Sequence, residues 1–455
     1  MLRLLLLMVS CGHGPGLALA EGSRSLQIAT FSTDITIPIG HRCMGVLKTK
    51  SQRIDDPLEA RGLVLLGSGS PVVLVALDWC EVRNASYDQW RTSLAAASGT
   101  TRDRVLVCSL HQHDAPVVDA GAQDYLDSVG LQGELFDREF HARCIRQAAL
   151  AVGKALASAK PLTHIGRGQA KVDQIASNRR VVHADGSVHF DRYSRMSPDS
   201  YQAQAKEGEI DPMLKSITFY SGDTAVAVLS SYATHPMSHY GAGAVSADFV
   251  GLARRRRQTE TPGTFQIYAS GCSGDVTAGK YNDGAAETRG ILADRLYEAM
   301  KQASRRIDKR PVGQVSFRHQ PFQLPFHEGE SMTRTSMDRV LHDSDASVEE
   351  RITAAMGLSS LDRVERGQPI DLPCLDFGDT KVTLLPGEAF VKYQLISQQL
   401  RPDSFVMAIG YGECWPGYVP TERAFQEGFG HGWRWVGRGC EAIIRDKLDR
   451  VLGPQ

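Results

Sequence analysis

Three histidines stand where apolar, strand-like runs of this chain end. His111 and His113 form an H-x-H pair that closes the run Val105–Leu110, and His235 follows the run Ala225–Ala233. Because side chains alternate faces along a strand, His111 and His113 are expected to point to the same side and to chelate one ion. Histidines satisfied in a core or on a surface are the alternative for either pattern alone. Neither pattern alone decides between a metal site and structural histidines, but three histidines brought together would suit one zinc ion.

Two further segments carry groups that suit such a site. Leu384–Glu388 turns through Pro-Gly and is expected to place Glu388 in the first turn of a helix. A carboxylate there either binds the metal as a fourth ligand or complements the helix dipole. The glycines of Gly271–Gly279 would let backbone N–H groups and a hydroxyl approach a reacting carbonyl, although a plain connection fits the spacing equally well. His239, in the same loop as the third histidine, is a candidate for contact with a ligand or with substrate.

The elements that must position these groups follow an α/β pattern. Apolar runs typical of buried strands occur at Val72–Leu77, Val105–Leu110, Ala225–Ala233, Phe265–Ala269, Val382–Leu385 and Phe405–Gly410. Helical spacing of apolar residues occurs at Phe136–Ala159, Ala285–Ser304, Ser347–Gly367, Ala389–Leu400 and Cys440–Leu452. We therefore predict mixed β-sheets flanked by helices, with the reactive groups where strands pass into loops.

The charge balance argues against a nucleic-acid-binding protein. Lysine and arginine total 51 against 52 acidic residues, so no net field draws a polyanion to the whole surface. The one basic run, Arg254–Arg257, follows a predicted helix start near Asp248 and is expected to be a solvated last turn. The length of 455 residues and the 42% hydrophobic content suit one large catalytic unit.

The N-terminal residues are typical of an export signal. Their apolar stretch and small-residue cleavage site predict a signal peptide over residues 1–20, too short to span a bilayer, and a single periplasmic or extracellular domain over residues 21–455. The residues before Cys11 also resemble a lipoprotein cleavage box, which would leave a lipid anchor there. The other cysteines could pair after export, but no C-x-x-C occurs and a cysteine zinc site is not expected. Asn84-Ala-Ser86 fits a glycosylation acceptor.

Eight short segments occur in an order that matches a known family. They are Asp34–Pro38, Asp56–Ala60, Ser109–His113, Asn178–Arg179, Ala233–Pro236, Ser246–Asp248, Pro386–Glu388 and Gly417–Thr421. In this order they resemble the catalytic domain of the neutral/alkaline, non-lysosomal ceramidases, with its D-I-T-x-P, D-P-L-x-A, T-H-T-H, N-R, S-S-D, P-G-E and G-Y-V-T-T stretches. The resemblance extends from near the expected mature N-terminus to the region of Phe429.

The resemblance implies roles for particular residues. The implied zinc ligands are His111, His113, His235, Glu388 and Tyr418. Arg179 would hydrogen-bond the substrate carbonyl or a neighbouring polar group. Such a zinc site activates water for attack on an amide or ester, and Tyr418 could stay on the metal or leave it. Thr277 and nearby N–H groups would orient water or the developing charge. The candidate acids for the leaving amine are Asp275, His239 and Asp248.

The chain departs from the family at its most reactive place. The family has G-D-V-S-P-N, and its serine is the residue usually assigned to catalysis, whereas this chain has Thr277 at that position. Threonine is bulkier and stiffer at χ1, which argues against a covalent acyl-enzyme. Gly430 falls where ceramidases carry a tyrosine. The C-terminal immunoglobulin-like domain of the family is not expected, because few residues follow the predicted helix Cys440–Leu452.

Three functions remain open from the sequence. The first is a zinc-dependent N-acyl hydrolase of ceramidase type, acting on ceramide or a related N-acyl lipid. The second is a zinc hydrolase of a non-lipid amide, ester or lactone, such as a modified sugar or a cell-wall fragment. The third is a non-catalytic exported binding protein on the same fold. In each case the expected partner is a small molecule or lipid, with no nucleic acid and at most peripheral membrane contact.

Overall fold

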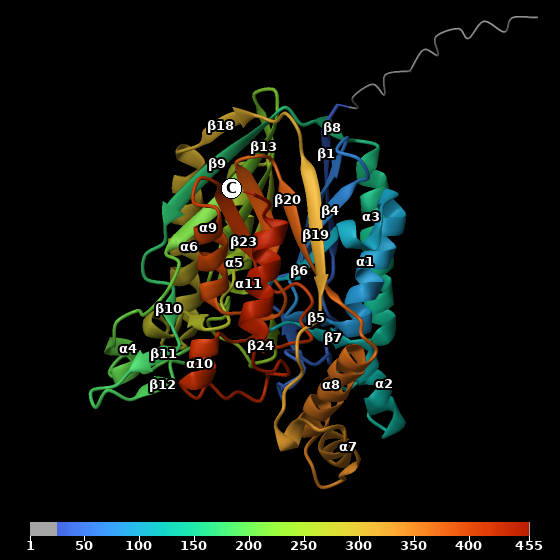
Figure 1. Cartoon of the computed structure of the whole chain (residues 1–455), viewed down its shortest axis with the longest axis vertical. Coiled ribbons are helices and arrows are strands. Elements are labelled where there is room, and N and C mark those ends of the chain that lie inside the picture. The colour runs from blue at the N-terminus through green and yellow to red at the C-terminus, as the bar shows by residue number, and fades with distance from the viewer. Residues whose placement is uncertain (1–24, 455) are drawn as a thin grey trace, which may run out of the picture.

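The computed structural model describes residues 25–454. The predicted signal peptide and the candidate lipid anchor at Cys11 lie outside the described residues. The described chain folds into three larger β-sheets with helices on their outer faces, as predicted (Figure 1). Its helices are α1 (Asn84–Ser98), α2 (Ala120–Ser128), α3 (Arg138–Leu156), α4 (Tyr201–Gln204), α5 (Asp248–Glu260), α6 (Ala286–Arg305), α7 (Arg334–His342), α8 (Val348–Glu365), α9 (Val391–Leu400), α10 (Glu422–Gln426) and α11 (Cys440–Val451).

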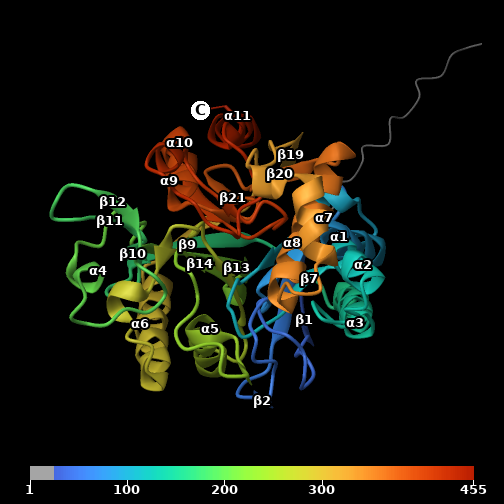
Figure 2. The same ribbon diagram turned by 90° about the horizontal axis from the view of Figure 1, so that it is seen from below.

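Two five-stranded sheets form the centre of the molecule. The first has the order β6 (Val105–Ser109), β4 (Val72–Leu77), β3 (Glu59–Leu66), β1 (Gln27–Asp34) and β8 (Lys160–Pro161). The second has the order β16 (Phe265–Ser270), β14 (Thr224–Tyr232), β13 (Met213–Ser221), β9 (His164–Lys171) and β18 (Asp308–Pro311). Helices α1 and α3 pack on the first sheet and α5 and α6 on the second, which leaves the sheets facing each other between helical layers (Figure 2).

The third sheet and five short strand pairs complete the fold. The third sheet has the order β19 (Ser316–Phe322), β20 (Ile370–Asp376), β21 (Thr380–Leu384) and β23 (Phe405–Ile409), and α9 and α11 pack against it. The short pairs are β2 (Arg53–Ile54) with β15 (Ala244–Val245), β5 (Glu81–Arg83) with β7 (Val117–Asp119), β10 (Ser177–Asn178) with β17 (Val276–Thr277), β11 (Arg180–Val182) with β12 (Val188–Phe190), and β22 (Glu388–Ala389) with β24 (Tyr418–Val419).

The continuous apolar runs in the sequence are strands buried on both faces. Along β4, Val73, Val75 and Leu77 belong to the core beneath α1 and α3, whereas Val72, Leu74 and Ala76 belong to the core between the sheets. Because neighbouring side chains of a strand point to opposite faces, a strand covered on both sides needs apolar residues at every position. All of the predicted strands and helices are present, with ends shifted by a few residues.

Each large sheet contains one parallel pair of strands, and these pairs position the candidate site. The pairs are β4 with β6, β14 with β16, and β21 with β23. Their C-terminal ends meet, because Gly410 N donates to Ser270 O at 2.9 Å and Ser109 N donates to Tyr411 O at 3.0 Å. The loops that leave all six strands therefore converge on one place, as ligand-binding loops do at the carboxyl ends of open α/β sheets.

Several expectations from the sequence were wrong or incomplete. The run Arg254–Arg257 is not a solvated last turn: Arg254 is buried in the middle of α5, with Nη1 2.6 Å from Asp78 and Nη2 3.0 Å from Glu59. Helix α1 was not predicted, because its short and polar residues give a weak apolar stripe. The eight cysteines from Cys43 to Cys440 are all unpaired and buried. No helix within residues 25–454 is both long enough and apolar enough to cross a membrane.

Candidate metal centre

His111 owes its orientation to an unusual backbone conformation and not to strand alternation. Strand β6 ends at Ser109, and His111 follows it in the left-handed region with φ 66°. Its N–H donates to Trp79 O at 3.0 Å, which ties the loop after β6 to the loop after β4. The rings of His111 and His113 lie 5.3 Å apart between centroids at 82°. The two histidines are therefore neighbours, as predicted, but the proposed reason was wrong.

His235 is oriented by the glycine-rich turn. Its N–H donates to Val276 O at 2.9 Å, and its ring Nδ1 lies 2.6 Å from Ser273 O. A carbonyl oxygen can only accept a hydrogen bond, so Nδ1 must be the nitrogen that carries the proton. Nε2 therefore carries the free lone pair. That lone pair is the one that faces Glu388, with Nε2 2.9 Å from Oε2.

Glu388 lies on the short strand β22 and not in the first turn of a helix. It pairs with Tyr418 of β24, and α9 begins only at Val391. The glycine-rich turn packs directly on this strand: Gly274 N donates to Ala389 O at 2.9 Å, and a Cβ at Gly274 would collide with the carbonyl oxygen of Glu388. This close approach explains glycine at that position without any contact to substrate.

His111, His235 and Glu388 form a buried group with the geometry of a metal site. Glu388 Oε2 lies 3.3 Å from His111 Nε2 and 2.9 Å from His235 Nε2, and one ligand atom from each residue fits within 4.8 Å of the other two. Two imidazoles and a carboxylate are a donor set that zinc accepts. The structure therefore supports a metal site here, and the residues present fit the predicted ion.

His113 lies beside this group and not in it. Its ring centroid is 6.4 Å from that of His235, and among the described residues it groups instead with His111 and Cys80. Both ring nitrogens of His113 are buried without a hydrogen-bond partner in the described part of the chain. Buried polar atoms without partners are rare, so this ring is available to a metal or to a bound molecule.

The charges of the site favour the metal-binding forms of Glu388, His235 and His113, but not that of His111. Burial raises the pKa of Glu388, but His111 and His235 outweigh it and hold the pKa well below its ordinary value. Burial lowers the pKa of His235 to about 4 and takes that of His113 well below its ordinary value. For His111 burial also lowers the pKa, yet Glu388 and Glu81 reverse the direction. A charged carboxylate and neutral imidazoles are the forms that bind a metal.

Tyr418 and Arg179 complete the wall of the site. The Tyr418 ring lies 6.1 Å from that of His235 at 25°, and burial raises the pKa of its hydroxyl, with Glu388 adding to the rise. The Arg179 guanidinium carbon lies 5.8 Å from the centroid of the Tyr418 ring. Within residues 25–454, the guanidinium makes no ion pair and no side-chain hydrogen bond, and its Nε is buried without a partner. A guanidinium that contacts a tyrosine ring but has no ion pair or side-chain hydrogen bond within residues 25–454 is free to bind a carbonyl oxygen or an anion.

Two other predicted site residues, Thr277 and Asp275, make contacts away from the metal group. Thr277 is fully buried on β17, and its hydroxyl lies 3.5 Å from Tyr193 O. Asp275 accepts from Asn178 Nδ2 and from Val391 N, each at 2.8 Å, and burial raises its pKa to about 6. These bonds tie the glycine-rich turn to β10 and α9.

His239 and Asp248 are also engaged away from the metal group. His239 Nδ1 lies 3.1 Å from Gly284 O. Asp248 accepts from the N–H of Ser238 at 3.0 Å and from its hydroxyl at 2.7 Å. In the described chain no hydrogen bond or ion pair joins either residue to His111, His235 or Glu388.

Four residues at the site were missed from the sequence. Cys80 Sγ lies 3.9 Å from His111 Nδ1, and Glu81 Oε1 lies 3.6 Å from the same nitrogen. Tyr411 stacks on the His111 ring at 4.5 Å and 14°, and the His431 ring lies 4.5 Å from that of Tyr418. Cys80 and Glu81 follow the apolar run Val72–Leu77 within four residues, and Tyr411 directly follows the run Phe405–Gly410, so the same signal could have found all three. His431 carried no comparable signal.

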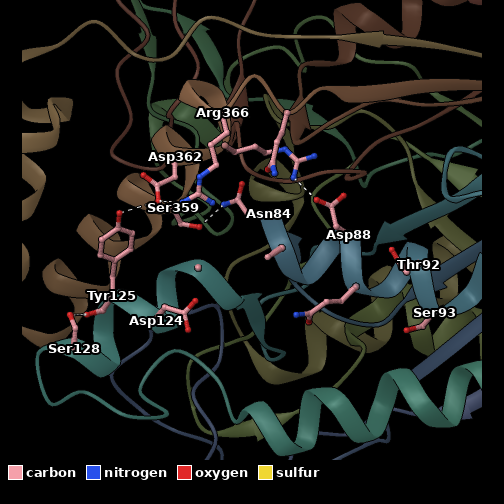
Figure 3. Close-up of a pocket in the computed structure, with 15 residues that line it drawn as sticks. Asn84, Asp88, Thr92, Ser93, Asp124, Tyr125, Ser128, Ser359, Asp362 and Arg366 are labelled. Carbon is pink, nitrogen blue, oxygen red and sulfur yellow. Dashed lines mark hydrogen bonds and ion pairs between the residues drawn. The ribbon is translucent and has the colours of Figure 1, made fainter.

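A separate cavity of about 760 Å³ lies between α1, α2 and α8 (Figure 3). Asn84, Tyr125 and Ser359 line it, and none of the metal-site residues does. Asn84 is buried there, with Nδ2 2.8 Å from Asp119 Oδ2 and 3.1 Å from Ser359 Oγ. A buried and bonded amide cannot carry a glycan in the folded protein, so the glycosylation reading of Asn84 was wrong.

Comparison with known proteins places this geometry in a known fold. No family model matches the chain, and no curated protein matches it. The crystal structure of neutral ceramidase from Pseudomonas aeruginosa matches with a TM-score of 0.66 and 16% identity, covering 93% of this chain and 73% of that one. A ceramidase complexed with C2 matches with a TM-score of 0.66 and 16% identity, covering 93% of this chain and 74% of that one. At this identity the likeness concerns the fold, and the chain has the fold of the neutral ceramidases.

Proposed function

We propose that this protein is a zinc-dependent hydrolase that cleaves an N-acyl amide bond, releasing fatty acid from ceramide or a related N-acyl lipid. The observation that carries the proposal is the buried group of His111, His235 and Glu388 beside the unpartnered guanidinium of Arg179. The ceramidase fold around it supports an amide as the substrate. An exported location and peripheral contact with a lipid surface belong to the same proposal.

The residues of the site would have two separate roles, metal binding and substrate binding. His111, His235 and Glu388 would hold one zinc ion, with Tyr418 and His113 beside them in the wall of the site. When bound, zinc supplies a Lewis acid that activates water and polarises a carbonyl. Arg179 would bind the substrate carbonyl oxygen and stabilise the negative charge that develops on it, since a buried cation acts strongly in a site that excludes water.

A second candidate function is hydrolysis of a non-lipid amide, ester or lactone. The observation that favours it is the position of Thr277, whose hydroxyl faces Tyr193 O from a fully buried strand. A hydroxyl held in that way is poorly placed to attack an acyl group, so attack by water is the simpler chemistry. Zinc-dependent attack by water suits an ester or lactone as well as an amide. A non-catalytic binding protein is the third candidate, and a measurable turnover would exclude it.

The test combines metal content with hydrolysis. Purified protein is assayed for zinc and for release of acyl groups from a short-chain ceramide, acylated sugars and simple esters, beside the variants His111→Gln and His141→Gln. His141 is a matched control, because it is buried and bonded to Trp90 Nε1 at 3.2 Å, away from the metal group. We expect about one zinc per chain and ceramide cleavage, both lost only in His111→Gln. Cleavage of sugars or esters alone would support the second candidate.

A further inference from the structure

A second buried carboxylate lies directly behind the metal group. Glu81, on β5, is fully buried, and neither of its oxygens reaches His235 or Glu388. Arg83 Nη1 donates to Oε2 at 2.9 Å, and the indole Nε1 of Trp433 donates to Oε1 at 2.9 Å. The carboxylate is thus fixed from two sides, and its Oε1 faces the His111 ring.

The His111 ring lies between two carboxylates. Its Nε2 is 3.3 Å from Glu388 Oε2, and its Nδ1 is 3.6 Å from Glu81 Oε1. The thiol of Cys80 lies 3.9 Å from Nδ1, and Tyr411 covers one face of the ring. An imidazole that binds a metal through Nε2 must keep its proton on Nδ1, and an acceptor beside Nδ1 fixes both the tautomer and the ring plane.

We propose that Glu81 is a positioning residue of the metal site: its carboxylate, 3.6 Å from Nδ1 of His111, electrostatically favours the proton on that nitrogen, so that the Nε2 lone pair points at the ion. The proposal rests on the proposed metal site and adds a role that the ligand set alone does not contain. The carboxylate also makes the imidazole a stronger donor, because a partial negative charge at Nδ1 raises the electron density at Nε2.

Trp433 links this carboxylate to the opposite wall of the site. Its indole donates to Glu81, and its backbone oxygen accepts from Tyr418 N at 3.0 Å. One residue therefore fixes both the carboxylate behind His111 and the strand that carries Tyr418. This connection gives a second, milder way to disturb Glu81: Trp433→Phe removes the indole N–H while it keeps an aromatic ring in place.

The experiment measures metal affinity in the absence of substrate. Metal-free protein is titrated with zinc against a competing chelator for the wild type, Glu81→Gln, Trp433→Phe and Glu413→Gln. Glu413 is the matched control, because it is also a buried carboxylate beside an arginine, with Oε2 3.5 Å from Arg363 Nη1. Its Oε1 accepts a hydrogen bond of 2.8 Å from Asn84 N, and its side chain has no bond to the metal group within the described residues. Thermal unfolding of each metal-free variant shows whether it folds.

The expected result is a 10- to 100-fold weaker zinc affinity for Glu81→Gln. A smaller loss is expected for Trp433→Phe, and none beyond about twofold for Glu413→Gln. Folded Glu81→Gln with wild-type affinity would overturn the role of Glu81 and leave the metal site standing. An equal loss in Glu81→Gln and Glu413→Gln would overturn it as well, since any buried carboxylate would then have the same effect. If the wild type itself bound no zinc, both the metal site and the role of Glu81 would fail.

Discussion

Arg179 is expected to weaken the fold and to serve the reaction, so its replacement should move stability and activity in opposite directions. The perturbation is Arg179→Met, which keeps most of the aliphatic volume and removes the charge. A buried N–H without a partner costs about 1–3 kcal/mol. The cation–π contact with Tyr418 returns about 0.5–1 kcal/mol. The variant should therefore be at least as stable as the wild type, with a gain of roughly 0–2.5 kcal/mol.

The same substitution should damage the reaction severely. If Arg179 stabilises the charge on the substrate carbonyl, its loss should lower kcat/KM by about 10²–10³-fold, as the loss of one oxyanion donor does in other hydrolases. Stability is measured by urea unfolding of the metal-free protein, and activity from initial rates of the metal-loaded protein on the best substrate of the panel above.

The neighbouring arginine gives the control. Arg180 holds Glu427 through two bonds of 2.6 and 2.7 Å and is partly exposed. Arg180→Met should lose about 1 kcal/mol of stability and keep its activity within about twofold. An Arg179→Met protein that is clearly less stable than the wild type would refute the reasoning, because the guanidinium would then have a partner in solution. Unchanged kcat/KM would refute its role in the reaction.

Three further predictions can be checked with the same protein. His113→Ala should keep a zinc affinity within about tenfold of the wild type, because the His113 ring lies outside the group of His111, His235 and Glu388. A complete loss of zinc in elemental analysis would instead show that His113 is a ligand. Cys80→Ser should leave the zinc content unchanged, and a loss there would identify the thiol as a ligand. Burial raises the pKa of Asp275 from 3.8 to about 6, so the unfolded chain loses this proton first as pH rises. Wild-type stability should therefore fall by about 2.4 kcal/mol relative to Asp275→Asn between pH 4 and 7. This appears as a gap between the urea midpoints of the two proteins that changes with pH, and a constant gap would contradict the prediction.

The sequence was sufficient for many of the elements and for the three residues of the candidate metal group. Strands such as β4 and β6 are apolar at every position because they are covered on both faces, and that pattern is visible in a single chain. His111, His235 and Glu388 were each found because they follow such strands directly. The order of short motifs predicted the ceramidase fold, which the structural matches support although the identity is only 16%.

The tertiary structure decided which of these residues act together. His111 takes a left-handed backbone, and Glu388 lies on a strand that pairs with Tyr418. These features depend on packing between segments far apart in the chain, which periodicity over a few residues does not record. The packing also gives two adjacent arginines different surroundings. Arg180 forms an ion pair with Glu427, whereas the buried Nε of Arg179 has no hydrogen-bond partner in the described residues. Sequence patterns thus determined what each segment becomes, and only the packing of the three parallel strand pairs determined which side chains share one desolvated space.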